Sequence, residues 1–122
     1  MLKLLIAVHS SLLTDLLVKS LSSHFVIHNC HTSTDMQRLI ETIRPDVLVV
    51  NLRLDKQDSL SVLQNCSYKP PAILALTDLV NQEVIQRATD AEIDALSLVP
   101  CSTRYITNII DRIAEKVPSP ET

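Results

Sequence analysis

Short apolar runs, set between segments with helical periodicity, limit the possible folds of this chain more than any other sequence feature. Nearly continuous apolar runs occupy residues 4–8, 47–50, 72–76 and 95–99, and the more mixed stretch FVIHNC at 25–30 also predicts a strand. An uninterrupted apolar run of this length is typical of a strand that is buried on both faces. The sheet must therefore carry helices on both sides.

Each predicted strand is followed by apolar residues that recur every three or four positions, as in an amphipathic helix. The stripes are Leu13, Leu16, Leu17 and Leu21; Leu39, Ile40 and Ile43; Leu60, Val62 and Leu63; Val84, Ile85 and Ala88; and Ile106, Ile109, Ile110 and Ile113. Five strands that alternate with five helices predict an α/β domain with a parallel sheet and right-handed crossovers. We assign residues 1–117 to this domain and residues 118–122 to a tail or the start of a linker.

Local signals predict where several helices begin and end. Ser10 or Ser11 is expected to cap the first helix, and Asp58 or Ser59 the third. The stretch 34–37, TDMQ, matches a capping box for the second helix, which should end at Arg44 because Pro45 disfavours helical geometry in its predecessor.

The sequence contains no glycine. Glycine normally occupies tight turns that need a positive φ. We expect Asn, Asp and Ser to take these positions, at the expense of some local strain.

Composition excludes several classes of function. The chain has 122 residues, of which 46% are hydrophobic and 20% charged, so one ordinary globular domain is expected and not a disordered segment. A net charge of -3 argues against nucleic-acid binding by this segment alone. Only three aromatic residues are present, Phe25, Tyr68 and Tyr105, too few for a base-stacking surface.

Membrane insertion and a disulfide framework are not expected. No apolar run approaches the roughly 18 residues that span a bilayer, and the run near the N-terminus is too short for a signal peptide. The three cysteines, Cys30, Cys66 and Cys101, are odd in number and widely spaced. These features favour a reducing cytoplasm.

Function is expected at the carboxyl ends of the strands, where ligands of open α/β sheets bind. The residues at these ends are Val8, His9, Asn51, Thr77 and Val99. Three stretches around them, DVLVVNLRLDKQDSLSVL at 46–63, AILALTD at 72–78 and Val99–Pro100, resemble the receiver domain of response regulators, the CheY-like family. The resemblance extends over nearly the whole chain.

This resemblance implies a flavodoxin-like (βα)5 fold with strand order 2-1-3-4-5 and helices on both faces of the sheet. It also implies a function in two-component signalling, in which an aspartate accepts a phosphoryl group from a histidine kinase. That chemistry uses an acidic pair after the first strand to hold Mg²⁺, the acceptor aspartate after the third, a hydroxyl after the fourth and a lysine after the fifth.

The sequence departs from this set at nearly every position. The acidic pair falls on Val8 and His9, the acceptor on Asn51 and the lysine on Val99, and only Thr77 matches. An amide is neutral and a far poorer nucleophile than a carboxylate of the same shape. We therefore predict a pseudo-receiver with no catalytic residue, no metal, no cofactor and no enzymatic activity, whose stability is indifferent to Mg²⁺.

The resemblance implies that partners dock on the surface of the fourth helix, fifth strand and fifth helix. Charged residues in that region are Glu83, Arg87, Asp90, Asp94, Arg104, Asp111 and Arg112. We expect a homodimer or a protein partner there. Transcription regulation would follow through a DNA-binding effector, attached after residue 122 or separate.

Other interpretations remain open. The neutral pocket of Val8, Asn51, Thr77 and Val99 would suit an apolar or amide-bearing ligand, and His9 or another group would be a residual phosphoacceptor. The Thr77 hydroxyl suits either an anion or local hydrogen bonds at a strand end. The residues His24, His28, Cys30 and His31 are of zinc-binding types, but their spacing matches no common zinc module and equally fits a polar strand at a sheet edge.

Overall fold

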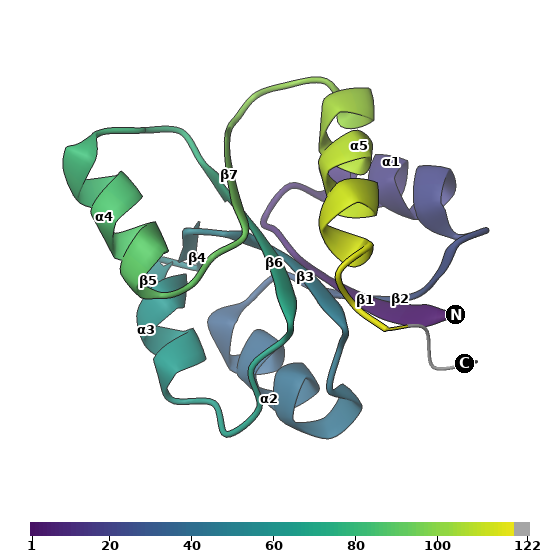
Figure 1. Ribbon diagram of the computed structural model, residues 1–122, viewed down its shortest axis with the longest axis horizontal. Helices are drawn as coiled ribbons and strands as arrows, with labels where there is room; N and C mark the ends of the chain where they lie inside the picture. Colours follow the sequence, from purple (N-terminus) through teal and green to yellow (C-terminus); the bar gives the residue numbers. More distant parts are fainter. Residues whose placement is uncertain (119–122) are drawn as a thin grey trace.

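The computed structural model describes residues 1–118 and contains the predicted five-stranded parallel sheet. Its strands are β1 (Leu2–Ala7), β2 (Phe25–Cys30), β3 (Val47–Asn51), β6 (Ala72–Thr77) and β7 (Ala95–Leu98). Their order in the sheet is β2-β1-β3-β6-β7, which confirms the predicted arrangement (Figure 1). The first and last strands differ from prediction in their limits, since Val8 and Val99 lie just beyond them. Of the predicted tail, residues 119–122 lie outside the described residues.

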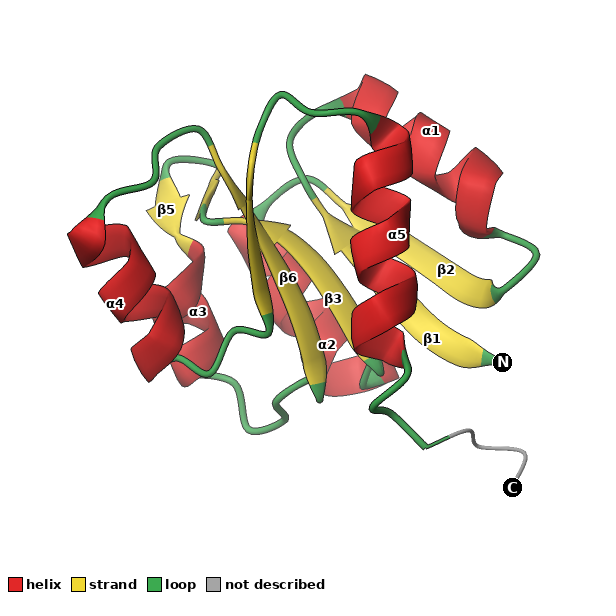
Figure 2. Cartoon of the chain, turned by 45° about the horizontal axis from the view of Figure 1, so that its top comes forward, coloured by secondary structure: helices red, strands yellow, loops and turns green. Residues whose placement is uncertain are grey.

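Helices cover both faces of the sheet (Figure 2). They are α1 (Ser11–Leu21), α2 (Ser33–Ile43), α3 (Ser59–Gln64), α4 (Gln82–Asp90) and α5 (Thr103–Ala114). Because side chains of a strand alternate between faces, Leu4 and Ile6 pack with α1 and α5, whereas Leu5 packs with α2. No helix within residues 1–118 is long and apolar enough to cross a membrane.

An antiparallel hairpin follows β3 and was not predicted. It consists of β4 (Arg53–Leu54) and β5 (Gln57–Asp58), with Asp55 and Lys56 as its two turn residues. Both turn residues have positive φ, 52° and 64°. This geometry is that of the two-residue turn that matches strand twist and usually contains Asn and Gly.

The other turns also correct a prediction. Positive φ occurs at Arg44 (54°) and Glu92 (59°) as well as in the hairpin, so only Asp55 is of an expected type. Long side chains at these positions gain contacts that offset the strain: the Arg44 guanidinium lies 5.5 Å from the centre of the Tyr68 ring, and Glu92 pairs with Lys69.

Two of the three predicted caps are confirmed. Ser10 caps α1 through its hydroxyl, which accepts from the N–H of Leu13, and Asp58 caps α3. The capping box at 34–37 was wrong, because α2 starts earlier, with Thr32 as its N-cap. Ser33 fixes this early start, since its buried hydroxyl donates to the carbonyl of Leu54 at 2.8 Å.

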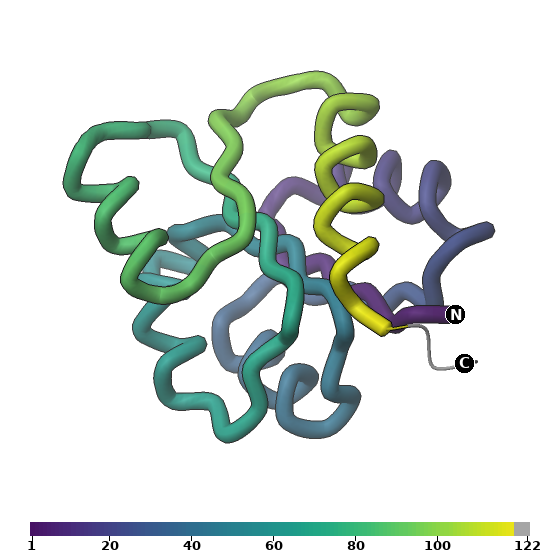
Figure 3. Tube along the Cα trace, in the orientation of Figure 1, coloured from purple at the N-terminus to yellow at the C-terminus, as the bar shows by residue number. Residues whose placement is uncertain are grey.

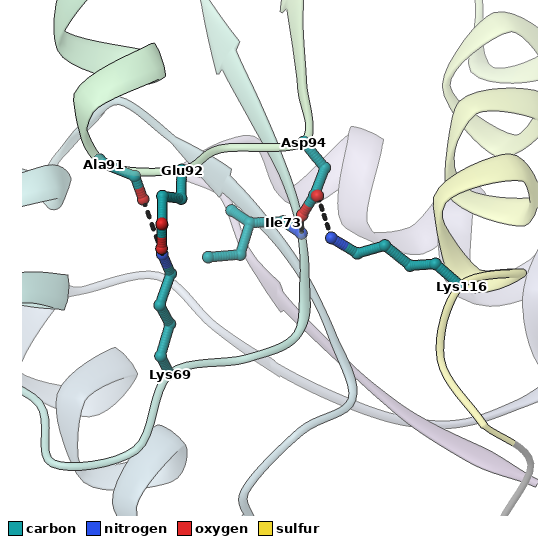
Figure 4. A network of polar contacts seen from close by, with 6 residues as sticks. All are labelled: Lys69, Ile73, Ala91, Glu92, Asp94 and Lys116. Carbon is teal, nitrogen blue, oxygen red and sulfur yellow. Dashed lines mark hydrogen bonds and ion pairs between the residues drawn. The ribbon is translucent and has the colours of Figure 1, made fainter.

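At the amino ends of the strands, aspartate carboxylates accept hydrogen bonds from the backbone of the sheet. Asp46 Oδ2 accepts from the backbone N–H of Lys3 at 2.8 Å. Asp94 Oδ2 accepts from the backbone N–H of Ile73 at 2.7 Å, and its other oxygen meets the ammonium of Lys116 (Figure 4). We refer to this end, with Lys69 and Glu92 beside it, as the amino edge.

Candidate functional site

The carboxyl ends of the strands form the opposite end of the molecule, which we call the rim. Figure 3 shows the loops that leave β6 and β7 as long curves at this end. His9, Asn51, Thr77 and Val99 all line one cavity of about 510 Å³ here. The structure thus brings together four of the five predicted rim residues, and the fifth, Val8, is fully buried in the core.

Asn51 is the central residue of the rim. It is the last residue of β3 and only 6% exposed. Its side-chain Oδ1 accepts from the backbone N–H of His9 at 2.9 Å, so the amide ties the end of β3 to the loop after β1. Its Nδ2 donates to no atom within residues 1–118 but is not sealed from the cavity. A buried, neutral side chain with an unused donor therefore occupies the predicted acceptor position.

Val8 and His9, the positions that the resemblance assigns to the acidic pair, contribute no carboxylate. Val8 is part of the core, and His9 is exposed. The carbonyl of Val8 accepts from Nδ1–H of His31 at 2.8 Å, which anchors the loop after β2 beside this position.

Thr77 and Val99 complete the predicted set. The Thr77 hydroxyl bonds both backbone groups of Leu79, at 3.1 and 3.2 Å, so it makes the local hydrogen bonds that were one of its two expected roles. The backbone N–H of Val99 donates to the carbonyl of Thr77 at 2.8 Å, and the following Val99–Pro100 peptide is cis. Val99 presents an isopropyl group to the cavity and no cation.

Charged side chains at this cavity cancel one another. Arg53 and Lys56 lie with Asp55 and Asp78 among its lining residues. Two cations and two anions leave no formal excess of charge. No cluster of three or more His, Cys, Asp or Glu residues able to hold a metal occurs within residues 1–118.

A second cavity, of about 430 Å³, lies beside the first and was not predicted. It is lined by His9, Ser10, Leu12, Leu13, Leu16, Asn51, Asp78, Val99, Pro100, Cys101, Thr103 and Ile106. Its walls come from the first turns of α1 and α5, and we call it the α1–α5 cavity. The sequence feature that could have indicated it is the pair of doublets Leu12–Leu13 and Leu16–Leu17. These doublets give the helix a wider apolar stripe than it needs to cover one face of the sheet.

The predicted partner surface has mixed character. Arg87 pairs with Asp58 at the start of α3, and Asp94 belongs to the amino edge. Asp90 accepts from Gln86 within α4 at 2.9 Å. The remaining predicted charges are exposed: Glu83, Arg104, Asp111 and Arg112. Exposed apolar side chains join them, namely Val80 (42%), Ile85 (46%), Leu98 (53%) and Tyr105 (53%).

The histidine and cysteine cluster around β2 does not converge. His24 lies before β2, where its Nδ1 contacts the Ser23 hydroxyl, whereas His31 lies after the other end of the strand. Cys30 is buried, and desolvation raises the pKa of its thiol to about 11. A thiol with so high a pKa is a poor nucleophile near neutral pH.

Comparison with known proteins identifies the fold. The chain matches no protein-family model, and no curated protein matches its sequence. Among solved structures, a CheY-like response regulator receiver domain from Methanospirillum hungatei JF-1 is similar with a TM-score of 0.84. The alignment has 17% identity and covers 95% of this chain and 96% of that one. This chain has the receiver fold.

Two further similar structures of response regulators differ in how much of their own chain the alignment covers. A LuxR-family DNA-binding response regulator from Staphylococcus aureus has a TM-score of 0.77 and 19% identity, over 93% of this chain and 99% of that one. A response regulator from Burkholderia pseudomallei, solved with a phosphorylated aspartic acid, calcium and citrate, has a TM-score of 0.75 and 16% identity. That alignment covers 95% of this chain and 70% of the other.

Proposed function

We propose that this chain is a pseudo-receiver, a receiver-fold domain that acts through protein contacts and not through phosphoryl transfer. The observation that carries the proposal is the state of Asn51. A neutral amide occupies the acceptor position, is almost fully buried and uses its oxygen to hold the backbone of His9.

The chemistry of phosphoryl transfer supports this proposal. The reaction depends on a nucleophilic oxygen and on positive charge around the transferring group. The Asn51 oxygen is already engaged as a hydrogen-bond acceptor, and an amide nitrogen is a weak nucleophile because its lone pair is delocalised. Mg²⁺ prefers several oxygen ligands in an octahedron, and neither Val8 nor His9 supplies one from its side chain. Val99 supplies no charge.

We place the contact surface on α4, β7 and α5, where exposed apolar and charged side chains occur together. Apolar residues within a polar surround are typical of the centre and margin of a protein interface. A homodimer would use the same patch on both subunits. By analogy with the Staphylococcus aureus regulator, the regulated output is transcription, through an attached or partner DNA-binding effector. The three free cysteines favour the cytoplasm.

Two experiments test the proposal, one for the absence of phosphoryl transfer and one for the contact surface. Incubation with acetyl phosphate and Mg²⁺, followed by intact mass measurement, should leave the mass unchanged, while the Burkholderia pseudomallei regulator treated in parallel should gain a phosphoryl group. A stable phosphoryl adduct on this chain would overturn the phosphate-independent assignment.

For the contact surface, sedimentation should detect self-association that Ile85→Asp or Leu98→Asp abolishes. Val26→Asp is the matched control, since Val26 is similarly exposed (43%) but lies on the edge strand β2. Association that survives both surface changes, or is lost in the control, would assign the contact to another face.

A further inference from the structure

We propose that the α1–α5 cavity binds a small, mainly apolar molecule that carries one carbonyl or carboxylate oxygen at its end. This proposal goes beyond the contact function above: ligand binding is tested independently of it, and only the regulatory consequence of binding rests on the proposed function. The cavity volume of about 430 Å³ lies within the range of about 300–1,000 Å³ that is common for small-molecule sites.

The walls of the cavity are suited to an apolar body. Leu12 is 69% exposed and Leu16 40% exposed, although Leu17 and Leu21 of the same helix are in the core. Ile106 also lines the cavity and is fully buried. An apolar ligand would remove the two exposed leucines from water, which favours binding in proportion to the apolar area covered.

The buried end of the cavity offers a hydrogen-bond donor without a protein partner. This donor is Nδ2 of Asn51, whose oxygen is already bonded to His9. Asn51 is only 6% exposed but its Nδ2 is reachable from the cavity, so a ligand that displaces water from this donor must supply an acceptor in its place. A ligand oxygen would satisfy it, whereas a ligand ammonium would not.

Two helix N-termini favour the same kind of atom. Ser10 and Ser102 are the N-caps of α1 and α5, and each uses its hydroxyl for only one N–H group of its helix, that of Leu13 or Tyr105. The first N–H groups of a helix have no intrahelical partner, and the helix dipole places partial positive charge there. Ser10 and Thr103 line the cavity, so the first turns of both helices border it.

One feature limits the ligand to at most a single acidic group. Asp78 is exposed and also lines the cavity, so its carboxylate would repel negative charge on the ligand and would disfavour a doubly charged ligand most strongly. The ligand would contact Thr103 at the start of α5, the same helix that carries Tyr105 on the proposed contact surface. Occupancy of the cavity would therefore act directly on that helix, as an input in place of phosphate.

The test uses the complete chain and three probes that differ only in their head group: octanoate, octanamide and octylamine. Methyl-detected NMR titrations at millimolar probe should move the signals of Leu12, Leu13, Leu16 and Ile106 with octanoate or octanamide. Octylamine should bind at least several-fold more weakly. Equal binding of all three probes, no binding of any, or shifts centred on Ile85 and Leu96 of the α4–β7 face would overturn the proposal.

Two variants distinguish the contribution of the Asn51 amide to binding from the contribution of the apolar walls. Asn51→Leu should weaken octanoate binding by roughly 3- to 10-fold, the value of one hydrogen bond. Because this change also removes the partner of His9, Leu16→Trp provides a second test by filling the mouth of the cavity, and it should abolish binding. Ile85→Ala is the control, because Ile85 lies on α4 and does not line the α1–α5 cavity. This variant should bind octanoate as the unchanged chain does. Unchanged affinity in Leu16→Trp would overturn the proposal.

Discussion

The two ends of the sheet use polar groups in opposite ways. At the amino edge, Asp46 and Asp94 each accept a hydrogen bond from the backbone of a neighbouring strand segment, and Lys116 neutralises Asp94. At the rim, the central polar group is the neutral amide of Asn51, and one of its two polar atoms is unused within residues 1–118. Carboxylates thus serve to fasten strands at one end and are missing from the centre of the other.

The two ends of the sheet thus differ in their charge as well as in their hydrogen bonds. In the receiver resemblance, carboxylates gather at the rim because a metal and a phosphoryl group need them there. Clustered carboxylates repel one another by about 1–4 kcal/mol per pair at short range, depending on solvent exposure. At the rim of this chain the carboxylates of Asp55 and Asp78 line the cavity together with Arg53 and Lys56, so no excess of negative charge gathers around Asn51.

The largest expected effect tests the amino edge. Asp94→Ala should destabilise the domain by about 2–3 kcal/mol, because the N–H of Ile73 and the ammonium of Lys116 both lose their partner. Guanidinium denaturation would measure the change. Asp90→Ala is the control, since Asp90 bonds only the exposed Gln86, and its effect should stay below about 0.5 kcal/mol. If Asn51→Ala proved more destabilising than Asp94→Ala, the comparison between the two ends would fail.

A smaller effect, of opposite sign, is expected at the turns. Lys56→Gly in the rim hairpin should stabilise the domain by about 1 kcal/mol, because glycine relieves the positive φ of 64°. Glu92→Gly at the amino edge relieves a similar backbone strain but removes the partner of Lys69 at 2.7 Å, so its gain should be smaller. Thermal unfolding of both variants would measure the difference. Equal gains would mean that the Lys69–Glu92 pair contributes nothing.

The smallest effect concerns pH. Hydrogen bonds from the Ser67 hydroxyl and the Tyr68 N–H lower the pKa of Glu41 below its ordinary value of 4.5, and the ammonium of Lys69 does the same for Glu92. A carboxyl whose pKa is lower in the folded state contributes stability above its unfolded pKa and loses it as the pH falls through the folded value.

The double variant Glu41→Gln/Glu92→Gln should therefore show a shallower loss of stability below about pH 4.5. Urea denaturation at a series of pH values would detect the change in slope. Asp78→Asn at the rim serves as control and should leave that slope unchanged. If Asp78→Asn flattened the pH dependence of stability more than the double variant does, the rim carboxylate, and not Glu41 and Glu92, would govern acid sensitivity.

The fold could be predicted because it depends on periodicity, which local sequence records directly. Buried runs and amphipathic stripes predicted a parallel α/β sheet, and the receiver resemblance supplied the strand order. Strand ends located His9, Asn51, Thr77 and Val99 at one cavity. The α2 cap was misplaced because the contact that sets it, from Ser33 to Leu54, joins residues 21 apart in the chain.

The parts that were not predicted depend on geometry that periodicity does not record. The β4–β5 hairpin uses Asp55 and Lys56 at positive φ, so the usual glycine signal was absent. The α1–α5 cavity required the distance between two helices, which no local pattern contains. Asn51 was correctly identified as a neutral residue, but its unused nitrogen became visible only when its oxygen was found bonded to His9.

The course of α5 has a mechanical consequence. The helix starts beside the rim at Thr103 and ends at Ala114, and Val117 then packs into the core with Leu2, near the start of β1. Its 12 residues make a rigid rod about 18 Å long that reaches from one end of the sheet to the other. A displacement of the first turn of α5 would be transmitted along the helix to its last turn. A structural change at the rim would therefore have a route to the opposite end of the molecule that does not pass through the hydrogen-bonded sheet.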